Sequence, residues 1–162
     1  MNRIEKAIEY AKEKHKGQYR TGGKEYITHP LHVMNMLKER GYDINYQLAG
    51  LFHDLLEDTD ATYEEILELS NEEVLKAVIL LTKTKGYIMQ KYIQNIKNNP
   101  IAKKVKAMDR LHNLRCAIVC DEKFKIKYIK ESIEWYLDFD DEIKEAIINL
   151  NNTLATPLKL NI

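Results

Sequence analysis

Much that would indicate a secreted, membrane-bound or nucleic-acid-binding protein is missing from this sequence. Its 162 residues contain two cysteines, which we expect to be reduced and buried rather than paired. The 25 basic and 25 acidic residues cancel to a net charge of zero, which argues against duplex nucleic acid as a partner. No apolar run is long enough to cross a bilayer, and the N-terminus is charged rather than similar to a signal peptide. We therefore expect a soluble, cytoplasmic protein without a membrane partner.

Strand-like alternation of apolar and polar residues is also absent, and the chain has no internal repeat or low-complexity linker. Helical patterns instead follow one another along the whole chain. Because 44% of the residues are hydrophobic and can fill a core, the sequence predicts one all-α domain of about eight or nine helices. The residues expected to open these helices are Asn2, Pro30, Asp43, Thr62, Ser70, Tyr87, Asn99–Pro100, Lys123 and Asp140.

Positive charge is missing from one long stretch, since no lysine or arginine lies between Asp43 and Lys76. Within it, residues 53–58 read HDLLED and bring one histidine and three carboxylates into six positions. On one continuous helix, at roughly 100° per residue, these polar groups span an arc of about 140° opposite an apolar face. A solvated surface is the alternative, but such surfaces usually mix charges to gain pairs four residues apart. Crowded carboxylates favour a bound cation instead, with acidic groups left over for proton transfer.

One histidine outside this string is a candidate metal ligand. His29 precedes Pro30, which is favourable at the first position of a helix, so we expect rigid backbone to hold its ring. The alternative is that His29 only caps the helix or packs beside Tyr26. His15 and His32 belong to no such group, and we expect them to be surface or packing residues.

A buried carboxylate is the other candidate. Asp109 lies in a helix expected over Ile101–Cys120, on a mostly apolar row of that helix. A carboxylate in such surroundings is costly unless it is paired or bound to a metal. The flanking Lys106 and Arg110 offer the alternative of a structural ion pair.

The ordered set His29, His53–Asp54 and Asp109 resembles the H…HD…D signature of the HD-domain metal phosphohydrolases. Four longer strings follow one another over about residues 4–137: GQYR at 17–20, YITHP at 26–30, HDLLEDT at 53–59 and KAMDRLHNLR at 106–115. In this order they resemble the hydrolase half of the RelA/SpoT proteins and the stand-alone small alarmone hydrolases. This resemblance implies an HD-domain helical bundle over residues 1–162, in which the helix after residue 137 is a support.

The family pattern also implies roles for single residues. It implies a manganese ion bound by His29, His53, Asp54 and Asp109. It implies that Glu57 and Asp58 form an acid/base pair beside the attacking water. It also implies that Arg20 and Asn113 contact the substrate. The ligand types alone leave manganese, iron, cobalt and zinc open. A bound ion of this kind lowers the pKa of its water and polarises a phosphoryl oxygen.

The substrate contacts depart from the family pattern. The family commonly has a lysine after its loop arginine, whereas Thr21 follows Arg20 here, so one positive charge is missing unless Lys24 supplies it. The small alarmone hydrolases also bind the substrate with a basic-xxx-Tyr motif on the following helix. The residues of this chain aligned with that motif are Tyr128 and Ser132. Other lysines can extend a local positive patch or remain an ordinary solvated surface; these are Lys83, Lys85 and Lys106. We expect loose binding of the nucleotide.

The resemblance thus implies metal-dependent hydrolysis of the 3′ pyrophosphate of guanosine 3′,5′-bis(diphosphate) and related alarmones, which yields GDP or GTP and pyrophosphate. No fused alarmone synthetase is expected. An HD-domain hydrolase of another nucleotide, such as a nucleoside monophosphate or NADPH, is the first alternative. A non-catalytic nucleotide sensor is the second, although Glu57 and Asp58 argue against it because a binder needs no proton-transfer groups.

Overall fold

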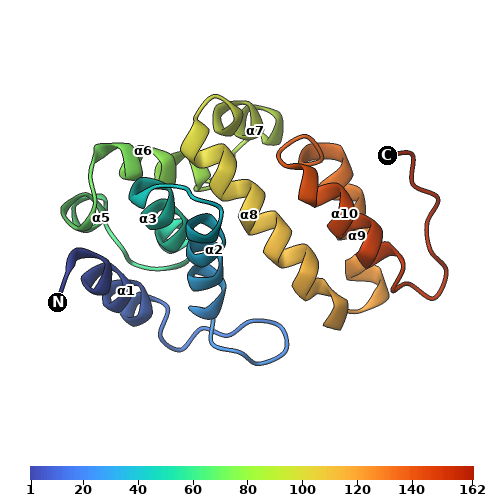
Figure 1. Cartoon of the computed structure of the whole chain (residues 1–162), viewed down its shortest axis with the longest axis horizontal. Coiled ribbons are helices and arrows are strands. Elements are labelled where there is room, and N and C mark those ends of the chain that lie inside the picture. Colours follow the sequence, from blue (N-terminus) through green and yellow to red (C-terminus); the bar gives the residue numbers. More distant parts are fainter. The chain divides into compact units, whose positions relative to one another are not determined.

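Helices make up nearly all of the regular structure in the computed structural model, which describes residues 1–162 (Figure 1). Ten α-helices and one 3₁₀ turn form, and the only β-type pairing is an isolated bridge between Tyr19 and Glu25. The all-α expectation is therefore confirmed. None of these helices combines the length and the apolar character that crossing a membrane requires.

The chain divides into two compact units, residues 1–106 and 107–162, and the expected single domain stays a prediction. The first unit contains α1 (Arg3–Lys14), α2 (Thr28–Glu39), α3 (Ile44–Phe52), α4 (Leu55–Asp58), α5 (Tyr63–Leu69), α6 (Glu72–Leu81), α7 (Met89–Lys97) and the start of α8 (Pro100–Cys116). The second contains the rest of α8, the 3₁₀ turn Ala117–Val119, α9 (Glu122–Trp135) and α10 (Asp141–Asn151), and α9 packs against α10.

Side-chain caps open several helices where the sequence predicts them. Asn2 forms a capping box with Glu5, the Asp43 carboxylate accepts from the first amides of α3, and Thr62 forms a second capping box with Glu65. Each such cap stabilises its helix by roughly 1 kcal/mol. The local signals in the sequence are thus sufficient to fix these starts.

Two other helix ends differ from the prediction. The N-cap of α6 is Asn71 rather than Ser70, because the Ser70 hydroxyl donates back to the Ile66 carbonyl of α5 and the Asn71 side chain accepts from Val74. The helix expected to reach Cys120 ends at Cys116 and tightens into the 3₁₀ turn. Both cysteines are free, but they are half-buried rather than buried.

The helix expected to carry the whole HDLLED string is broken in the structure. α3 ends at Phe52 and α4 begins at Leu55, so that His53 and Asp54 lie in the turn between them. The His53 Nδ1 donates to the carbonyl oxygen of Gly50 over 2.6 Å, and a continuous helix would use this oxygen for the amide of Asp54. The side chain thus competes with the helical ladder at the point where the helix breaks.

α2 and α3 lie side by side and place both histidines of the signature in the first unit (Figure 1). Gly50 allows the close approach of the two helices, since a Cβ built on it would lie 2.8 Å from Leu37 Cδ1 and 3.2 Å from Val33 Cγ1. α2 begins at Thr28, two residues earlier than expected, which makes His29 its second residue. Pro30 is tolerated in this first turn because the first amides of a helix have no partner within it.

Candidate metal centre

The His53 imidazole and the Asp54 carboxylate face each other at the break between α3 and α4, where His53 Nε2 lies 3.0 Å from Asp54 Oδ2. The Gly50 carbonyl can only accept a hydrogen bond, so the proton of a neutral His53 ring resides on Nδ1. Nε2 is then an acceptor, and it faces a second acceptor. This arrangement favours a cation, either a proton or a metal ion, at the pair.

His29 lies beside this pair. Its Nε2 is 4.0 Å from Asp54 Oδ2, and its ring centroid is 5.2 Å from that of His53. The Tyr26 ring lies 6.0 Å from the His29 ring. His29 therefore packs beside Tyr26, as the alternative expects, and the same position is compatible with metal binding. Both histidines are almost fully buried.

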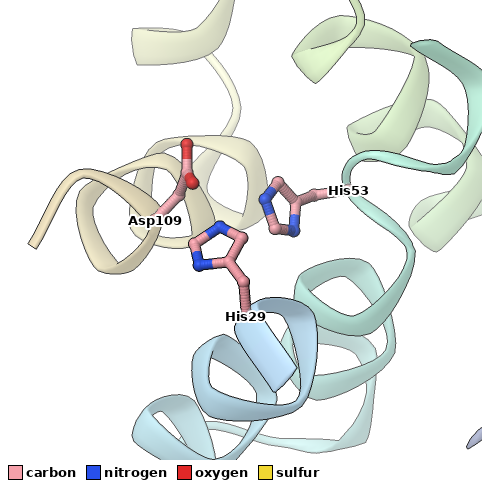
Figure 2. A group of neighbouring side chains, drawn as sticks. All are labelled: His29, His53 and Asp109. Atoms are coloured by element: carbon pink, nitrogen blue, oxygen red, sulfur yellow. The ribbon is translucent and has the colours of Figure 1, made fainter. Parts of the chain in front are cut away.

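Asp109 completes a group of three ligand-type side chains. One ligand atom each of His29, His53 and Asp109 lies within 4.8 Å of the others, and the three side chains point toward one another in Figure 2. Asp54 is not a member of this group but contacts the two histidines at the distances given above. The carboxylate of Asp109 also accepts a hydrogen bond from Asn113 Nδ2 over 3.1 Å.

The residues present fit a divalent metal ion. Two ligand atoms bound at right angles to one ion, each about 2.1 Å from it, are about 3.0 Å apart. The distance between His53 Nε2 and Asp54 Oδ2 matches this spacing. Imidazole nitrogen and carboxylate oxygen together suit manganese, iron, cobalt or zinc. The His53 Nδ1 bond to Gly50 is the type of outer contact that orients a metal-binding histidine.

Glu57 and Asp58 are exposed residues of α4, one turn beyond His53 and Asp54. Glu57 Oε1 accepts a hydrogen bond from the backbone amide of Lys83 over 2.7 Å, and the Asp58 carbonyl accepts from Gln18 Nε2 over 2.8 Å. Both residues lie outside the His-His-Asp group. Their acid/base roles stay predictions.

The expected substrate residues are distributed over two elements. Arg20 and Lys24 lie in the loop between α1 and α2, where the Arg20 amide donates to the Lys24 carbonyl over 2.8 Å. The Arg20 guanidinium is 5.9 Å from the centroid of the Tyr26 ring, and Lys24 is exposed. Asn113 lies in α8 and donates to Asp109. Their contacts with a nucleotide stay predictions.

The guanidinium of Arg110 pairs with Glu131 rather than with Asp109, its partner in the ion-pair alternative. Its guanidinium binds Glu131 Oε1 over 2.8 Å and lies 4.2 Å and 4.1 Å from the ring centroids of Tyr128 and Tyr136. Ser132, which is fully buried, accepts a hydrogen bond from it over 3.3 Å. The pair aligned with the basic-xxx-Tyr motif thus packs around an arginine of the second unit.

Sequence reasoning missed three supporting groups in the first unit. His15 is a buried packing residue, one of the two roles expected for it, but its partners were not predicted: its Nδ1 donates to Gln18 Oε1 over 2.8 Å, and its ring packs 5.0 Å from that of Tyr26. Burial lowers the pKa of His15 below its usual value. The Tyr26 hydroxyl donates to Asp54 Oδ2 over 2.6 Å. The GQYR and YITHP strings contain Gln18 and Tyr26, but no local pattern connects them with residue 54.

Comparison with solved structures supports the fold. A structure titled "A metazoan ortholog of SpoT hydrolyzes ppGpp and plays a role in starvation responses" matches with a TM-score of 0.75 and 23% identity. The match covers 94% of this chain and 95% of the other.

The sequence relatives of this chain are much longer proteins. A guanosine-3′,5′-bis(diphosphate) 3′-pyrophosphohydrolase of Aquifex aeolicus is 42% identical over 142 residues, which are 82% of this chain and 20% of that protein. A probable GTP pyrophosphokinase of Mycobacterium leprae is 34% identical over 81% of this chain and 18% of its own length. The chain therefore spans about a fifth of these relatives. The HD domain profile matches residues 7–137, and the chain belongs to the HD domain family.

Proposed function

We propose that the chain hydrolyses the 3′ pyrophosphate of guanosine 3′,5′-bis(diphosphate) and related alarmones, with a Mn²⁺ ion held by His29, His53, Asp54 and Asp109. The observation that carries this proposal is the 3.0 Å approach of His53 Nε2 to Asp54 Oδ2, with the His53 proton held on Nδ1 by Gly50. Both facing atoms are then available to one ion. The location that fits this reaction is the cytoplasm.

The names of the relatives support a guanosine polyphosphate as the substrate but divide between hydrolysis and synthesis. The Aquifex aeolicus relative carries the hydrolase name, and the Mycobacterium leprae relative carries a synthetase name. The chain covers about a fifth of each, so the names alone do not choose the reaction. Candidate metal ligands one turn before the Glu57–Asp58 pair in the sequence favour hydrolysis, because a metal bound by them can activate water.

In the proposed reaction, water attacks the phosphorus that is bonded to the 3′ oxygen, and the bond between this phosphorus and the 3′ oxygen breaks. An ion held by these residues would supply a more acidic water and polarise a phosphoryl oxygen. Glu57 accepts the proton of the attacking water, and the departing 3′ oxygen receives a proton to become the 3′ hydroxyl of the product. Asp58 is the second group of this acid/base pair. The phosphates of the nucleotide are bound by Arg20 and Lys24, and the nucleotide is also contacted by Asn113.

The test is a nucleotide panel assayed for pyrophosphate and for orthophosphate. Protein stripped with a chelator and reloaded with Mn²⁺ should release pyrophosphate from guanosine tetraphosphate. An Asp109→Asn variant of the same preparation should not. Orthophosphate release from a nucleoside monophosphate or NADPH, without turnover of guanosine tetraphosphate, would assign another substrate. Binding of guanosine tetraphosphate without turnover of any nucleotide would make the protein a sensor.

A further inference from the structure

The hydroxyl of Tyr26 contacts the carboxylate of Asp54. It donates to Oδ2 over 2.6 Å, and this is the same oxygen that lies 3.0 Å from His53 Nε2 and 4.0 Å from His29 Nε2. A carboxylate oxygen has two lone pairs, so Oδ2 can accept from the phenol and still face a cation. The phenol thus fixes the oxygen that lies between the two imidazoles.

The Tyr26 side chain is itself held on several sides. Its ring packs against the rings of His15 and His29, at centroid distances of 5.0 and 6.0 Å. His15 is in turn bound by Gln18, whose amide group donates to the carbonyl of Asp58 in α4. The phenol is therefore tied to the C-terminal end of α1, to α2 and to α4, and this bracing restricts the direction of its hydroxyl.

We infer that Tyr26 is a positioning residue of the metal centre: its hydroxyl holds the Asp54 carboxylate in the orientation that binds the ion. This inference rests on the metal site of the proposed function. Hydrogen bonds to a charged acceptor are shorter and stronger than those between neutral groups, and 2.6 Å is typical of them. Loss of an outer contact to a metal ligand typically weakens metal binding by about 10- to 100-fold. We expect a loss of this size when the hydroxyl is removed.

The sharpest variant is Tyr26→Phe, because it removes the hydroxyl and leaves the ring that contacts His15, His29 and Arg20. Tyr42→Phe is the matched control. Tyr42 is also half-buried, packs against another tyrosine ring at 4.8 Å, and has a lysine ammonium 5.5 Å from its ring centroid. The phenol of Tyr42 contacts none of the candidate metal ligands, so removal of its hydroxyl should leave metal binding unchanged.

Titration of the metal-free full chain with Co²⁺ and with Mn²⁺ alone tests the inference without any nucleotide. The visible spectrum of bound Co²⁺ reports the ligand arrangement, and thermal unfolding of the metal-free proteins reports the fold. Tyr26→Phe should bind Co²⁺ about 10- to 100-fold more weakly than wild type, with an altered spectrum. In an Asp54→Ala background, which has no side-chain oxygen for the phenol to hold, the same change should alter the affinity less than about twofold, because Tyr26 acts through Asp54.

The outcomes separate this inference from the proposed function. If wild-type protein binds neither ion, the metal site itself is excluded, and the inference fails with it. Wild-type protein that binds metal, with Tyr26→Phe equal to it in affinity and spectrum, would overturn the inference alone. Equal losses in the wild-type and Asp54→Ala backgrounds would also overturn it, since Tyr26 would then act through the fold. Should Tyr26→Phe lower the unfolding temperature of the metal-free protein, the comparison between the two backgrounds still decides.

Discussion

The carboxylate of Glu57 accepts a hydrogen bond from the backbone amide of Lys83, with Oε1 2.7 Å from the nitrogen. This contact joins the end of the HDLLED string to the loop that follows α6. A backbone donor holds the carboxylate in place with any residue other than proline at position 83. Glu57 is thus oriented by a group that every substitution at position 83 except proline preserves.

Glu57→Gln should keep the protein folded and bound to metal but lower turnover by about 100-fold or more. The amide oxygen of glutamine can still accept from Lys83, so the geometry survives while the ability to take a proton is lost. Steady-state assays and metal analysis of the same preparation measure both properties. Glu64→Gln, at an exposed glutamate of α5, is the control. Loss of metal from a folded Glu57→Gln protein would make Glu57 a ligand instead.

Gly50→Ala should destabilise the protein even though alanine is the better helix former. The exchange gains up to about 1 kcal/mol of helix propensity. The new Cβ would meet Leu37 Cδ1 at 2.8 Å and Val33 Cγ1 at 3.2 Å, and overpacking of this kind costs about 1 to 3 kcal/mol. We expect a net loss of up to about 2 kcal/mol in urea unfolding. Asn35→Ala, on the exposed face of α2, has the propensity gain without the clash and should not destabilise.

How much of this structure the sequence predicts depends on the range of the interactions involved. The caps at Asn2, Asp43 and Thr62 follow from contacts two or three residues along the chain, so their signals are local and correct. The break at His53–Asp54 depends on a side chain that competes for the Gly50 carbonyl, and neither glycine nor proline lies at 53 or 54 to mark it.

The candidate site shows the same division. His29, His53 and Asp109 can be predicted as candidate ligands because imidazoles and carboxylates occur in a recognisable order, and one ligand atom of each lies within 4.8 Å of the others. The supporting groups are backbone carbonyls and amides, or side chains such as Tyr26, which contacts a residue 28 positions away. Backbone groups are present at every residue, so they leave no trace in a sequence. Only the folded chain shows which of them are used.

Divalent metal should stabilise the chelator-treated protein against heat. An ion present at 100 times its dissociation constant adds about 2.7 kcal/mol to the free energy of unfolding. For a chain of this size, that corresponds to a rise of about 5 to 10 °C in Tm. Differential scanning calorimetry with and without Mn²⁺ measures the shift, and Asp109→Asn should abolish most of it. A full shift in Asp109→Asn would show that the ion binds elsewhere.

Acid should destabilise the metal-free protein partly through His15. Burial lowers the pKa of His15 in the folded state below the ordinary value of 6.5. The unfolded chain therefore binds a proton below about pH 6.5 that the folded chain resists, and the free energy of unfolding falls as the pH falls through this range. The neutral ring keeps its proton on Nδ1 for Gln18, while its buried Nε2 has no acceptor for a second proton.

Urea unfolding at about pH 7.5 and about pH 5 should show a smaller pH dependence in His15→Gln than in wild type, although His15→Gln is less stable at both values. His32→Gln is the control, because His32 is exposed on α2 and its removal leaves the burial of His15 unchanged. An unchanged pH dependence in His15→Gln would contradict the assignment of this acid sensitivity to His15.

Thr21→Lys should tighten nucleotide binding with little effect on turnover. Thr21 is exposed in the loop that carries Arg20, at the position where the family commonly has a lysine. A charge-assisted contact in a dry pocket is worth about 1.5 to 3 kcal/mol, but an exposed one is worth about 0.5 to 1 kcal/mol. We therefore expect KM for guanosine tetraphosphate to fall about two- to fivefold, and this gain should shrink as salt screens the new charge. Thr156→Lys makes the same exchange at an exposed threonine of the C-terminal segment and should leave KM unchanged. An equal fall in KM for both variants would attribute the effect to net charge rather than to a phosphate contact at residue 21.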